Sequence, residues 1–387
     1  MDKSFSLAKR LVFLFCWLCK AVRCSGQVQQ PSNVVTLAFI GDISFDSAVR
    51  YFHNKGFCQY NTTFQKVASF LREADLAIAN LESPLINSDI RHDAQLKFSP
   101  LLSADTDSIQ ALSFAGIDIV TLANNHYDDY GTRPVNYSVH LLSQISVQAF
   151  GYTYGRKEDD KPQTPLLVKV NGIRIGFLGY CSTYRKELTP EGKVYFHCVE
   201  KRGNLTAGPA LYSDEAATRD VNDLKGKVDV IVVFMHWGIE SFTDPSDRQK
   251  KEANHLQSLG VQIIIGAHPH VLEGHTTNGT QLIAYSLGNA LFAPKNKNKL
   301  FYCNREPSEE TVKEFETYMA SPEGLADPTT HSRIMRVQID KKGLVGASYL
   351  PLRINFDPTS KCLQPTPTGP ATKWIRVCSA DDTACLN

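Results

Sequence analysis

The chain has almost no excess of charge of either sign. Its 387 residues include 41 lysines and arginines against 40 aspartates and glutamates, which gives a formal net charge of +1. Nucleic acids and acidic membranes attract clustered positive charge, so this balance gives no reason to expect a nucleic-acid partner. Hydrophobic residues at 42% and charged residues at 21% are typical of folded proteins and exclude a disordered or fibrous chain.

The sequence also lacks an apolar run long enough to span a bilayer. The apolar run near the start, Leu11 to Cys19, would form about 14 Å of helix, against a hydrocarbon core of about 30 Å. Basic residues precede this run, and the small residues Cys24-Ser25-Gly26 follow it. This layout predicts a signal peptide at 1–26 that is cleaved near Gly26. We therefore expect a secreted protein with no stable membrane span after cleavage.

None of the cysteines that remain after removal of residues 1–26 has the CxxC spacing of a zinc site, so a structural role is expected for them. Removing residues 1–26 takes away three of the ten cysteines and leaves Cys58, Cys181, Cys198, Cys303, Cys362, Cys378 and Cys385. Because seven is odd, we expect up to three disulfides and one further thiol, in a pairing that the sequence does not define. Four Asn-x-Ser/Thr motifs predict N-glycosylation, at Asn61, Asn136, Asn204 and Asn278.

Apolar strands alternate with helical patterns along most of the chain. Buried strands are predicted at 34–40, 76–81, 117–122, 229–235 and 261–265, and helices at 64–73, 105–115, 134–143 and 247–259. Hairpins are predicted at 166–179 and 334–350. This order indicates an α/β fold with antiparallel strands at the sheet edges. We expect one domain at 34–355, with an irregular insertion at 293–330 and a cysteine-containing tail at 356–387.

Polar residues follow five of the predicted strands. They are Asp42, Asn80 with Glu82, the triplet Asn124-Asn125-His126, His236, and the pair His268 and His270. Ligands of open α/β sheets bind outside the carboxyl ends of the strands, so these side chains are expected at one rim. Imidazole, carboxylate and amide oxygen suit divalent zinc, manganese or iron. A single Asp or Asn after a strand is usually a turn or helix cap, and a single His-x-His is more often a surface or structural feature than a metal site. Five strand ends together favour a metal site.

Six motifs in order make the pattern specific: Gly41-Asp42, Asn80-Leu81-Glu82, Ala123-Asn124-Asn125-His126, His236-Trp237-Gly238, Gly266-Ala267-His268-Pro269-His270 and Ser286-Leu287-Gly288-Asn289. Over residues 37–292 the chain resembles the CapA family of capsule or poly-γ-glutamate synthesis proteins. That resemblance implies a metallophosphatase-like (calcineurin-like) fold, a layered α-β-β-α sandwich of mixed sheets. It also implies a metal site at the carboxyl ends of the strands.

The resemblance further implies the arrangement of one or two divalent ions. Asp42 and His270 would hold one ion, Glu82 would bridge, and the other ion would be held by Asn125, His236 and His268. The chain departs from the broader fold at Ser44, where metallophosphatases have a histidine, so the first ion would have fewer protein ligands and a single-metal site stays open.

Three further residues are candidates for work beside the metals. His126 is a candidate general acid, or alternatively a histidine that orients a neighbouring ligand. Trp237 and Asn289 are weaker candidates for substrate contact, with core packing and a turn cap as the alternatives.

The resemblance also supplies the expected activity. We expect a metal-dependent hydrolase of a phosphoester or of a γ-glutamyl amide, with a glutamate polymer or a phosphoester as partner. The alternative is a non-catalytic polyanion-handling or assembly protein in poly-γ-glutamate synthesis or export. A secreted glycoprotein with merely structural histidines is a third possibility. The sequence does not indicate the metal or the oligomeric state.

Overall fold

The computed structural model describes residues 34–91, 101–154, 163–183, 198, 207–294, 307–368 and 374–378, which belong to one unit that begins at Asn33. The predicted signal peptide at 1–26 and the sequon at Asn204 lie outside the described residues. Of the other three sequons, Asn136 and Asn278 are exposed and Asn61 is half-buried. Within the described part of the chain, none of the helices has the length and apolar character needed to cross a membrane.

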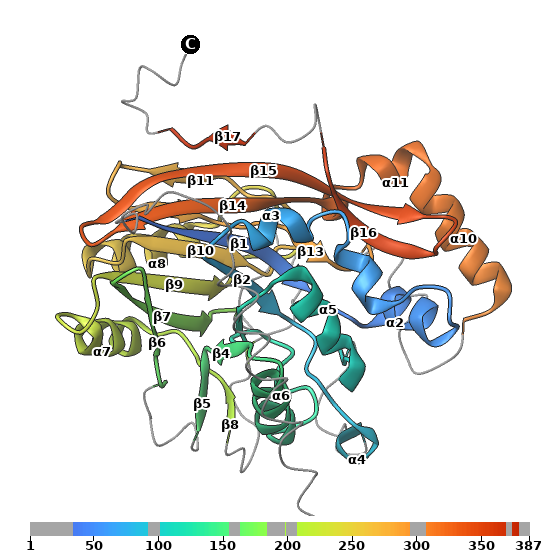
Figure 1. Cartoon of the computed structure of the whole chain (residues 1–387), viewed down its shortest axis with the longest axis horizontal. Helices are drawn as coiled ribbons and strands as arrows, with labels where there is room; N and C mark the ends of the chain where they lie inside the picture. Colours follow the sequence, from blue (N-terminus) through green and yellow to red (C-terminus); the bar gives the residue numbers. More distant parts are fainter. Residues whose placement is uncertain are drawn as a thin grey trace, which may run out of the picture. The chain divides into compact units, whose positions relative to one another are not determined.

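The first sheet has nine strands and is mixed (Figure 1). Its parallel strands are β1 (Val35–Ile43), β2 (Leu76–Leu81), β3 (Ile119–Thr121), β4 (Gln148–Phe150) and β13 (Asn289–Leu291), of which β13 pairs with β1. The antiparallel strands are β14 (His331–Asp340), β15 (Gly343–Asp357), β16 (Cys362–Pro367) and β17 (Ile375–Arg376). They extend the sheet beyond β1, as the predicted antiparallel additions require.

The second sheet has six strands, in the order β11-β12-β10-β9-β7-β6. Four are parallel: β12 (Leu282–Ala284), β10 (Ile263–Ala267), β9 (Val230–His236) and β7 (Ile173–Cys181). The edge strands β11 (His275–Thr277) and β6 (Leu166–Val170) are antiparallel to their neighbours. A separate two-stranded ribbon joins β5 (Tyr152–Tyr154) and β8 (Ala207–Pro209).

The alternation of side chains along the strands builds the layers. In β1, Leu37 and Phe39 belong to a core shared with the second sheet, whereas Ala38 and Ile40 belong to a core shared with helices. Strand β9 alternates in the same way: Val232 packs in the core between the sheets, and Val233 packs in a third core that helices cover. Successive strand residues point to opposite faces, so two sheets buried on both faces need apolar residues at every position. The predicted α-β-β-α sandwich is confirmed.

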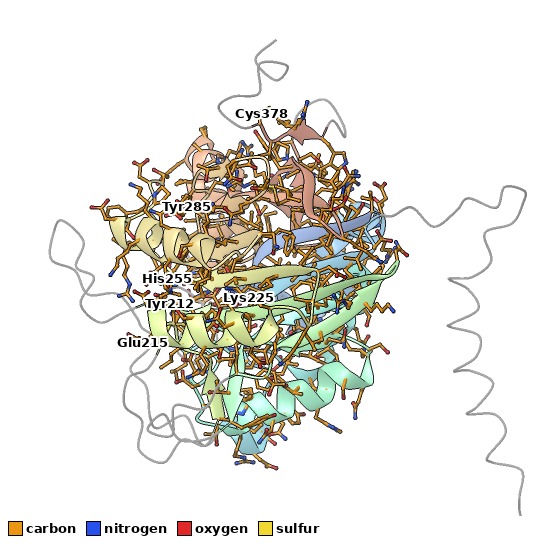
Figure 2. The ribbon with its side chains drawn as sticks, turned by 90° about the vertical axis from the view of Figure 1, so that its left-hand side faces the viewer. Tyr212, Glu215, Lys225, His255, Tyr285 and Cys378 are labelled. Atoms are coloured by element: carbon orange, nitrogen blue, oxygen red, sulfur yellow. A yellow bond between two sulfur atoms is a disulfide. The ribbon has the colours of Figure 1, made fainter. Side chains whose placement is uncertain are left out.

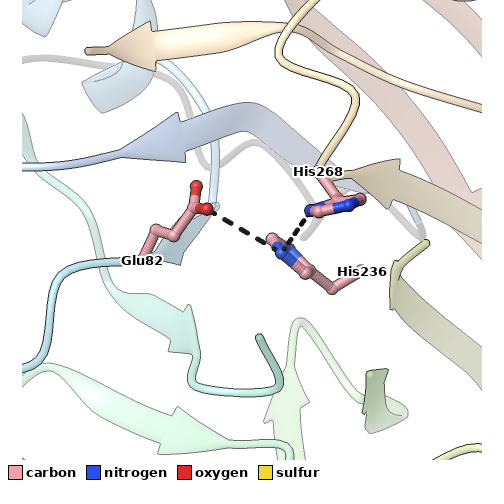
Figure 3. A group of neighbouring side chains, drawn as sticks. All are labelled: Glu82, His236 and His268. Atoms are coloured by element: carbon pink, nitrogen blue, oxygen red, sulfur yellow. Dashed lines mark hydrogen bonds and ion pairs between the residues drawn. The ribbon is translucent and has the colours of Figure 1, made fainter. Parts of the chain in front are cut away.

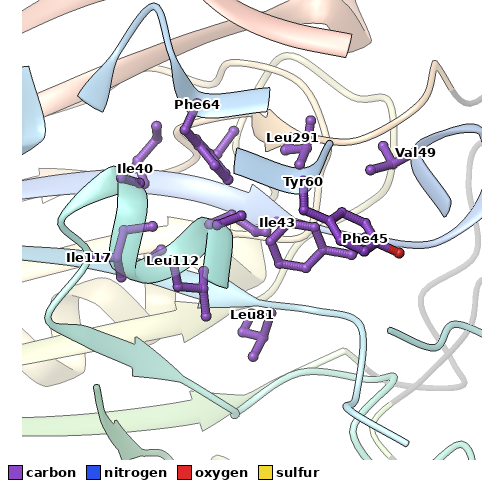
Figure 4. Packing of buried hydrophobic residues seen from close by; sticks show 14 of the residues in the cluster. Ile40, Ile43, Phe45, Val49, Tyr60, Phe64, Leu81, Leu112, Ile117 and Leu291 are labelled. Carbon is purple, nitrogen blue, oxygen red and sulfur yellow. The ribbon is translucent and has the colours of Figure 1, made fainter. Parts of the chain in front are cut away.

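Helices cover the outer face of each sheet. On the first sheet they are α2 (Ser47–Asn54), α3 (Ala68–Arg72), α5 (Ile109–Ala115), α6 (Arg133–Gln144) and α10 (Glu309–Ala320), and Figure 4 shows part of their core. On the second sheet, α7 (Asp214–Leu224) lies beside α8 (Asp247–Ser258). There His255 Nε2 is 3.1 Å from the carbonyl oxygen of Asp214. Figure 2 labels His255 on α8 and Glu215 on α7. The short helices are α4 (Ser88–Arg91), α11 (Pro322–Ala326), η1 (Tyr60–Phe64), η3 (Thr106–Ser108) and η5 (Pro328–Thr330).

The segment 293–330 differs from the predicted irregular insertion, because α10 and α11 lie within it. Ser308 caps α10 by accepting a hydrogen bond from the amide of Thr311, and two glutamates occupy the first turn. Helix α10 then buries Phe315, Tyr318 and Met319 on one face. The charged composition of this segment led to the prediction of an irregular insertion, whereas α10 is a capped amphipathic helix. The predicted helix at 64–73 is likewise shorter, since η1 ends at Phe64 and α3 covers only Ala68–Arg72.

Disulfides attach distant parts of the chain to this sandwich. Cys58 is bonded to Cys362 across 304 positions of sequence, which ties the start of β16 to the loop after α2. Cys181 at the end of β7 is bonded to Cys198, and Cys378 is disulfide-bonded too. The first residues of the predicted tail are consequently part of the sheet rather than an appendage.

Candidate metal centre

The carboxyl ends of strands from both sheets meet at one place. Asp42 lies near the end of β1, Glu82 follows β2, and His236 ends β9. Register pairs Asp42 with Asn80, and His236 with the residue just before His268. The six predicted metal-ligand residues are at most 5% exposed and come from both sheets: Asp42, Glu82, Asn125, His236, His268 and His270. The predicted ligands therefore lie between the two sheets rather than along the edge of a single one.

Two donor groups share Glu82. One consists of Asp42, Glu82 and His270, and the other of Glu82, His236 and His268; within each, the ligand atoms lie within 4.8 Å of one another. Glu82 Oε1 is 3.8 Å from His236 Nε2 and 3.7 Å from His270 Nε2 (Figure 3 shows the second group). A carboxylate placed between two histidines in this way is suited to bridging two cations.

The second group includes an amide oxygen as well. His236 Nε2 lies 2.8 Å from Asn125 Oδ1 and 3.1 Å from His268 Nδ1. Burial, and then the charge on His268 and His270, hold the pKa of His236 well below its usual value. A neutral imidazole is the form that binds a metal.

Asn289 positions His270. Its amide nitrogen donates to the carbonyl oxygens of His270, at 3.3 Å, and Thr329, at 2.9 Å. Its Oδ1 therefore accepts a hydrogen bond from His270 Nδ1 at 2.9 Å. The other ring nitrogen of His270, Nε2, faces Glu82. Asn289 is 1% exposed, and this hydrogen bond orients His270; contact of Asn289 with substrate stays a prediction.

The charge of the first group favours a cation. Burial by itself lowers the pKa of His270, but the charge of Glu82 and the hydrogen bond and charge of Asp42 outweigh it and raise this pKa to about 9. Two buried carboxylates that stabilise a positive imidazolium would stabilise a divalent ion for the same reason. Donor types and charge both fit a divalent metal.

The backbone at the site is bent to bring these side chains together. His268 has φ 94° and His270 has φ 59°, in the left-handed region that costs a non-glycine residue energy. Gly41 passes so close to the carbonyl of Gly288 that a Cβ atom would overlap it. The amide of Asp42 donates to that same carbonyl at 3.1 Å, which fixes the strand end that carries the carboxylate.

A chain of amides connects the ends of β1, β2 and β3. Asn80 donates to Asp42 Oδ1 at 2.7 Å, and Asn124 donates to Asn80 Oδ1 at 3.0 Å. Asn124 Oδ1 in turn accepts from the amide of His126 at 3.1 Å. Asp42 Oδ2 is then left to accept from the amide of His268 at 3.1 Å. Asn80 and Asn124, which sequence reasoning left without a role, hold the ligands in place.

His126 has a carboxylate partner that the sequence analysis missed. Its Nδ1 is 2.7 Å from Asp129 Oδ2, which also accepts from the amide of Leu102 at 2.8 Å. Asp129 is completely buried and His126 is 6% exposed. The i, i+3 spacing of the two residues after β3 was the available signal. Because the carboxylate accepts, Nδ1 carries the hydrogen and Nε2 is the remaining nitrogen.

Three further buried residues, Ser44, Trp237 and Glu240, complete the description of the site and its surroundings. Ser44 is 3% exposed, and its Oγ accepts a hydrogen bond from the amide of Asp46 at 3.3 Å. The ring of Trp237 is fully buried in the outer core of the second sheet and donates to the carbonyl of Tyr285, so it is a core residue rather than a pocket wall. Glu240, which sequence analysis did not single out, forms a third group with His268 and His270.

The part of the chain that carries these motifs matches known proteins. It is 28% identical over 264 residues to the capsule biosynthesis protein CapA of Bacillus anthracis, which covers 68% of this chain and 61% of that protein. It is 30% identical over 285 residues to the PGA biosynthesis protein CapA of Bacillus subtilis strain 168, covering 73% and 69%. The chain thus spans less than two thirds of the first relative's length and just over two thirds of the second's.

A solved structure and a family model complete the comparison. A 5'-nucleotidase from Candida albicans SC5314 is similar with a TM-score of 0.39 and 10% identity, over 84% of this chain and 54% of that one. Residues 36–294 match the model of a family described as bacterial capsule synthesis protein PGA_cap. The matched residues include both donor groups, the His126–Asp129 pair and Asn289. Because the match covers more than half of its length, the chain belongs to the PGA_cap family of CapA-like capsule synthesis proteins.

Proposed function

We propose that this protein is a metal-dependent hydrolase, which cleaves a phosphoester or a γ-glutamyl amide with water as the nucleophile. One observation carries the proposal: two buried donor groups share Glu82. Asp42, Glu82 and His270 would hold one divalent ion, and Glu82, Asn125, His236 and His268 the other. When bound, such ions supply Lewis acidity, which activates water and stabilises negative charge on the attacked centre.

The protein's own residues would handle the proton. His126 follows the ligand Asn125 directly, and Asp129 holds its Nδ1 hydrogen at 2.7 Å. That bond fixes the orientation of the ring, and Nε2 would give a proton to the leaving group. Asp129 positions His126 in this scheme and takes up no proton itself.

The substrate and the location are part of the proposal. Both curated relatives are capsule or PGA biosynthesis proteins by name. A γ-linked glutamate polymer is accordingly the first substrate and partner to test, followed by a phosphoester. We also propose a secreted glycoprotein, which is supported by disulfides and by the exposed sequons at Asn136 and Asn278.

One departure from the metallophosphatase pattern, at Ser44, favours a second function. Ser44 stands where metallophosphatases have a histidine, and its hydroxyl accepts from a neighbouring backbone amide. If the first ion is lost for this reason, the same fold would serve as a non-catalytic polyanion-handling protein in poly-γ-glutamate synthesis or export.

Metal analysis and turnover distinguish the two functions. Purified full chain is expected to hold about one or two transition-metal ions and to hydrolyse either bis-p-nitrophenyl phosphate or a γ-glutamyl oligomer. His268→Ala and Glu82→Gln should lose metal and turnover together. His140→Ala, which removes an exposed histidine of α6, is the matched control and should keep both. Metal-free wild-type protein that still binds poly-γ-glutamate would establish the second function instead.

A further inference from the structure

Glu240 belongs to the same buried cluster, although neither donor group described above contains it. One carboxylate oxygen of Glu240 and one ring nitrogen each of His268 and His270 lie within 4.8 Å of one another. All three residues are buried, and Glu240 is 7% exposed. His268 belongs to one donor group and His270 to the other, so Glu240 lies beside a residue of each group.

The loop after β9 is held against the His-Pro-His turn that follows β10. The chain turns at Gly238, with φ 83°, where a Cβ atom would overlap the Gln249 side chain. Two residues after this turn comes Glu240, and the amide of Ser241 then donates to the carbonyl of Pro269 at 2.7 Å. Since Pro269 lies between the two histidines, this hydrogen bond keeps the Glu240 carboxylate next to both.

The donor count shows where another carboxylate is needed. Among the described residues, Glu82, Asn125, His236 and His268 offer four donors to one ion, whereas Asp42, Glu82 and His270 offer three to the other. Ser44 adds no imidazole there, and its Oγ accepts a hydrogen bond from the amide of Asp46 at 3.3 Å. Carboxylate oxygen is a common ligand of zinc and manganese, and a carboxylate buried this deeply is stabilised by a cation.

We propose that Glu240 is a further metal ligand, which completes the coordination of the ion held by Asp42 and His270. The inference rests on the proposed function, since it presupposes a metal centre. It makes a prediction about stoichiometry: Glu240 belongs to the three-donor ion and not to the four-donor one. Loss of Glu240 should consequently remove one ion and leave the other.

The test measures bound metal rather than activity. Full chain is equilibrated by dialysis with Mn²⁺ or Zn²⁺ over a range of free concentrations, and bound metal is measured by mass spectrometry. We expect two ions in wild type and one in Glu240→Gln, or at least a tenfold weaker second binding step. Asp244→Asn removes an exposed carboxylate four residues further along the same loop and should behave as wild type.

The outcomes separate this inference from the proposed function. Wild type that binds no metal would overturn both. Wild type and Glu240→Gln that bind metal with equal stoichiometry and affinity would overturn only the role of Glu240. If the variant fails to fold, anomalous diffraction from metal-loaded wild type decides the question. A Glu240 oxygen within about 2.2 Å of an ion supports the inference, and one outside ligand distance of every ion refutes it.

Discussion

Glu273 predicts an unusual pH dependence of stability. Its side chain is 3% exposed, on the loop three residues beyond His270. Oε2 accepts a hydrogen bond from Gln249 at 2.7 Å, whereas Oε1 has no hydrogen-bond partner. Burial raises the pKa of this carboxyl from 4.5 to about 8, and the hydrogen bond from Gln249 opposes the shift. The folded protein therefore keeps a proton on Glu273 at neutral pH.

The sign of the effect follows from proton binding. Between pH 4.5 and 8 the folded state holds the proton and the unfolded state has released it. Stability that is present below the unfolded pKa is thus lost as pH rises towards the folded pKa. Each pH unit in this window costs about 1.4 kcal/mol, so the loss from pH 5.5 to 7.5 is about 2.7 kcal/mol. Glu273→Gln has the same shape and does not titrate.

Urea unfolding at pH 5.5, 6.5 and 7.5 measures the difference between variant and wild type. We expect the stability of Glu273→Gln relative to wild type to increase by about 2–3 kcal/mol across this range. Other titrating groups are common to both proteins and cancel in the comparison. Glu215→Gln, at an exposed position of α7, controls for the loss of one charge. A constant difference between Glu273→Gln and wild type at all three pH values would refute the reasoning.

Three further changes test the framework of the site. Gly41→Ala places a methyl group where the carbonyl oxygen of Gly288 lies, so we expect the free energy of unfolding, measured with urea, to fall by more than about 3 kcal/mol. Near-wild-type stability would contradict this close approach. Cys58→Ser breaks the disulfide to Cys362, which closes a loop of 304 positions, and should lower the unfolding free energy by about 2–5 kcal/mol. Reducing agent also breaks the other disulfides, so it should lower the stability of both proteins, and that of wild type by the larger amount. Asp129→Asn should lower kcat about 10²- to 10⁴-fold with unchanged metal content, because only the charge that orients His126 is lost; a fall in bound metal instead would show that the pair supports the ligands.

Local sequence patterns were sufficient to predict the elements whose structure depends mainly on residues close in sequence. The strand before Asp42 and the strand ending at His236 were predicted from unbroken apolar runs, and the polar residues after them mark where each run ends. The capped helix α10 was missed because its charged positions face solvent and only three residues anchor it.

The sequence by itself determined the α/β layering, the strand ends and the kinds of donor atom that collect there. Tertiary structure alone decided how those donors are divided. Asp42 Oδ2 accepts from the amide of His268 across 226 positions of sequence, and His236 reaches Asn125 across 111. The sharing of Glu82 between the two donor groups and the placement of Glu240 depend on how two sheets pack. No periodicity within one segment encodes that packing, since it is a property of contacts between segments.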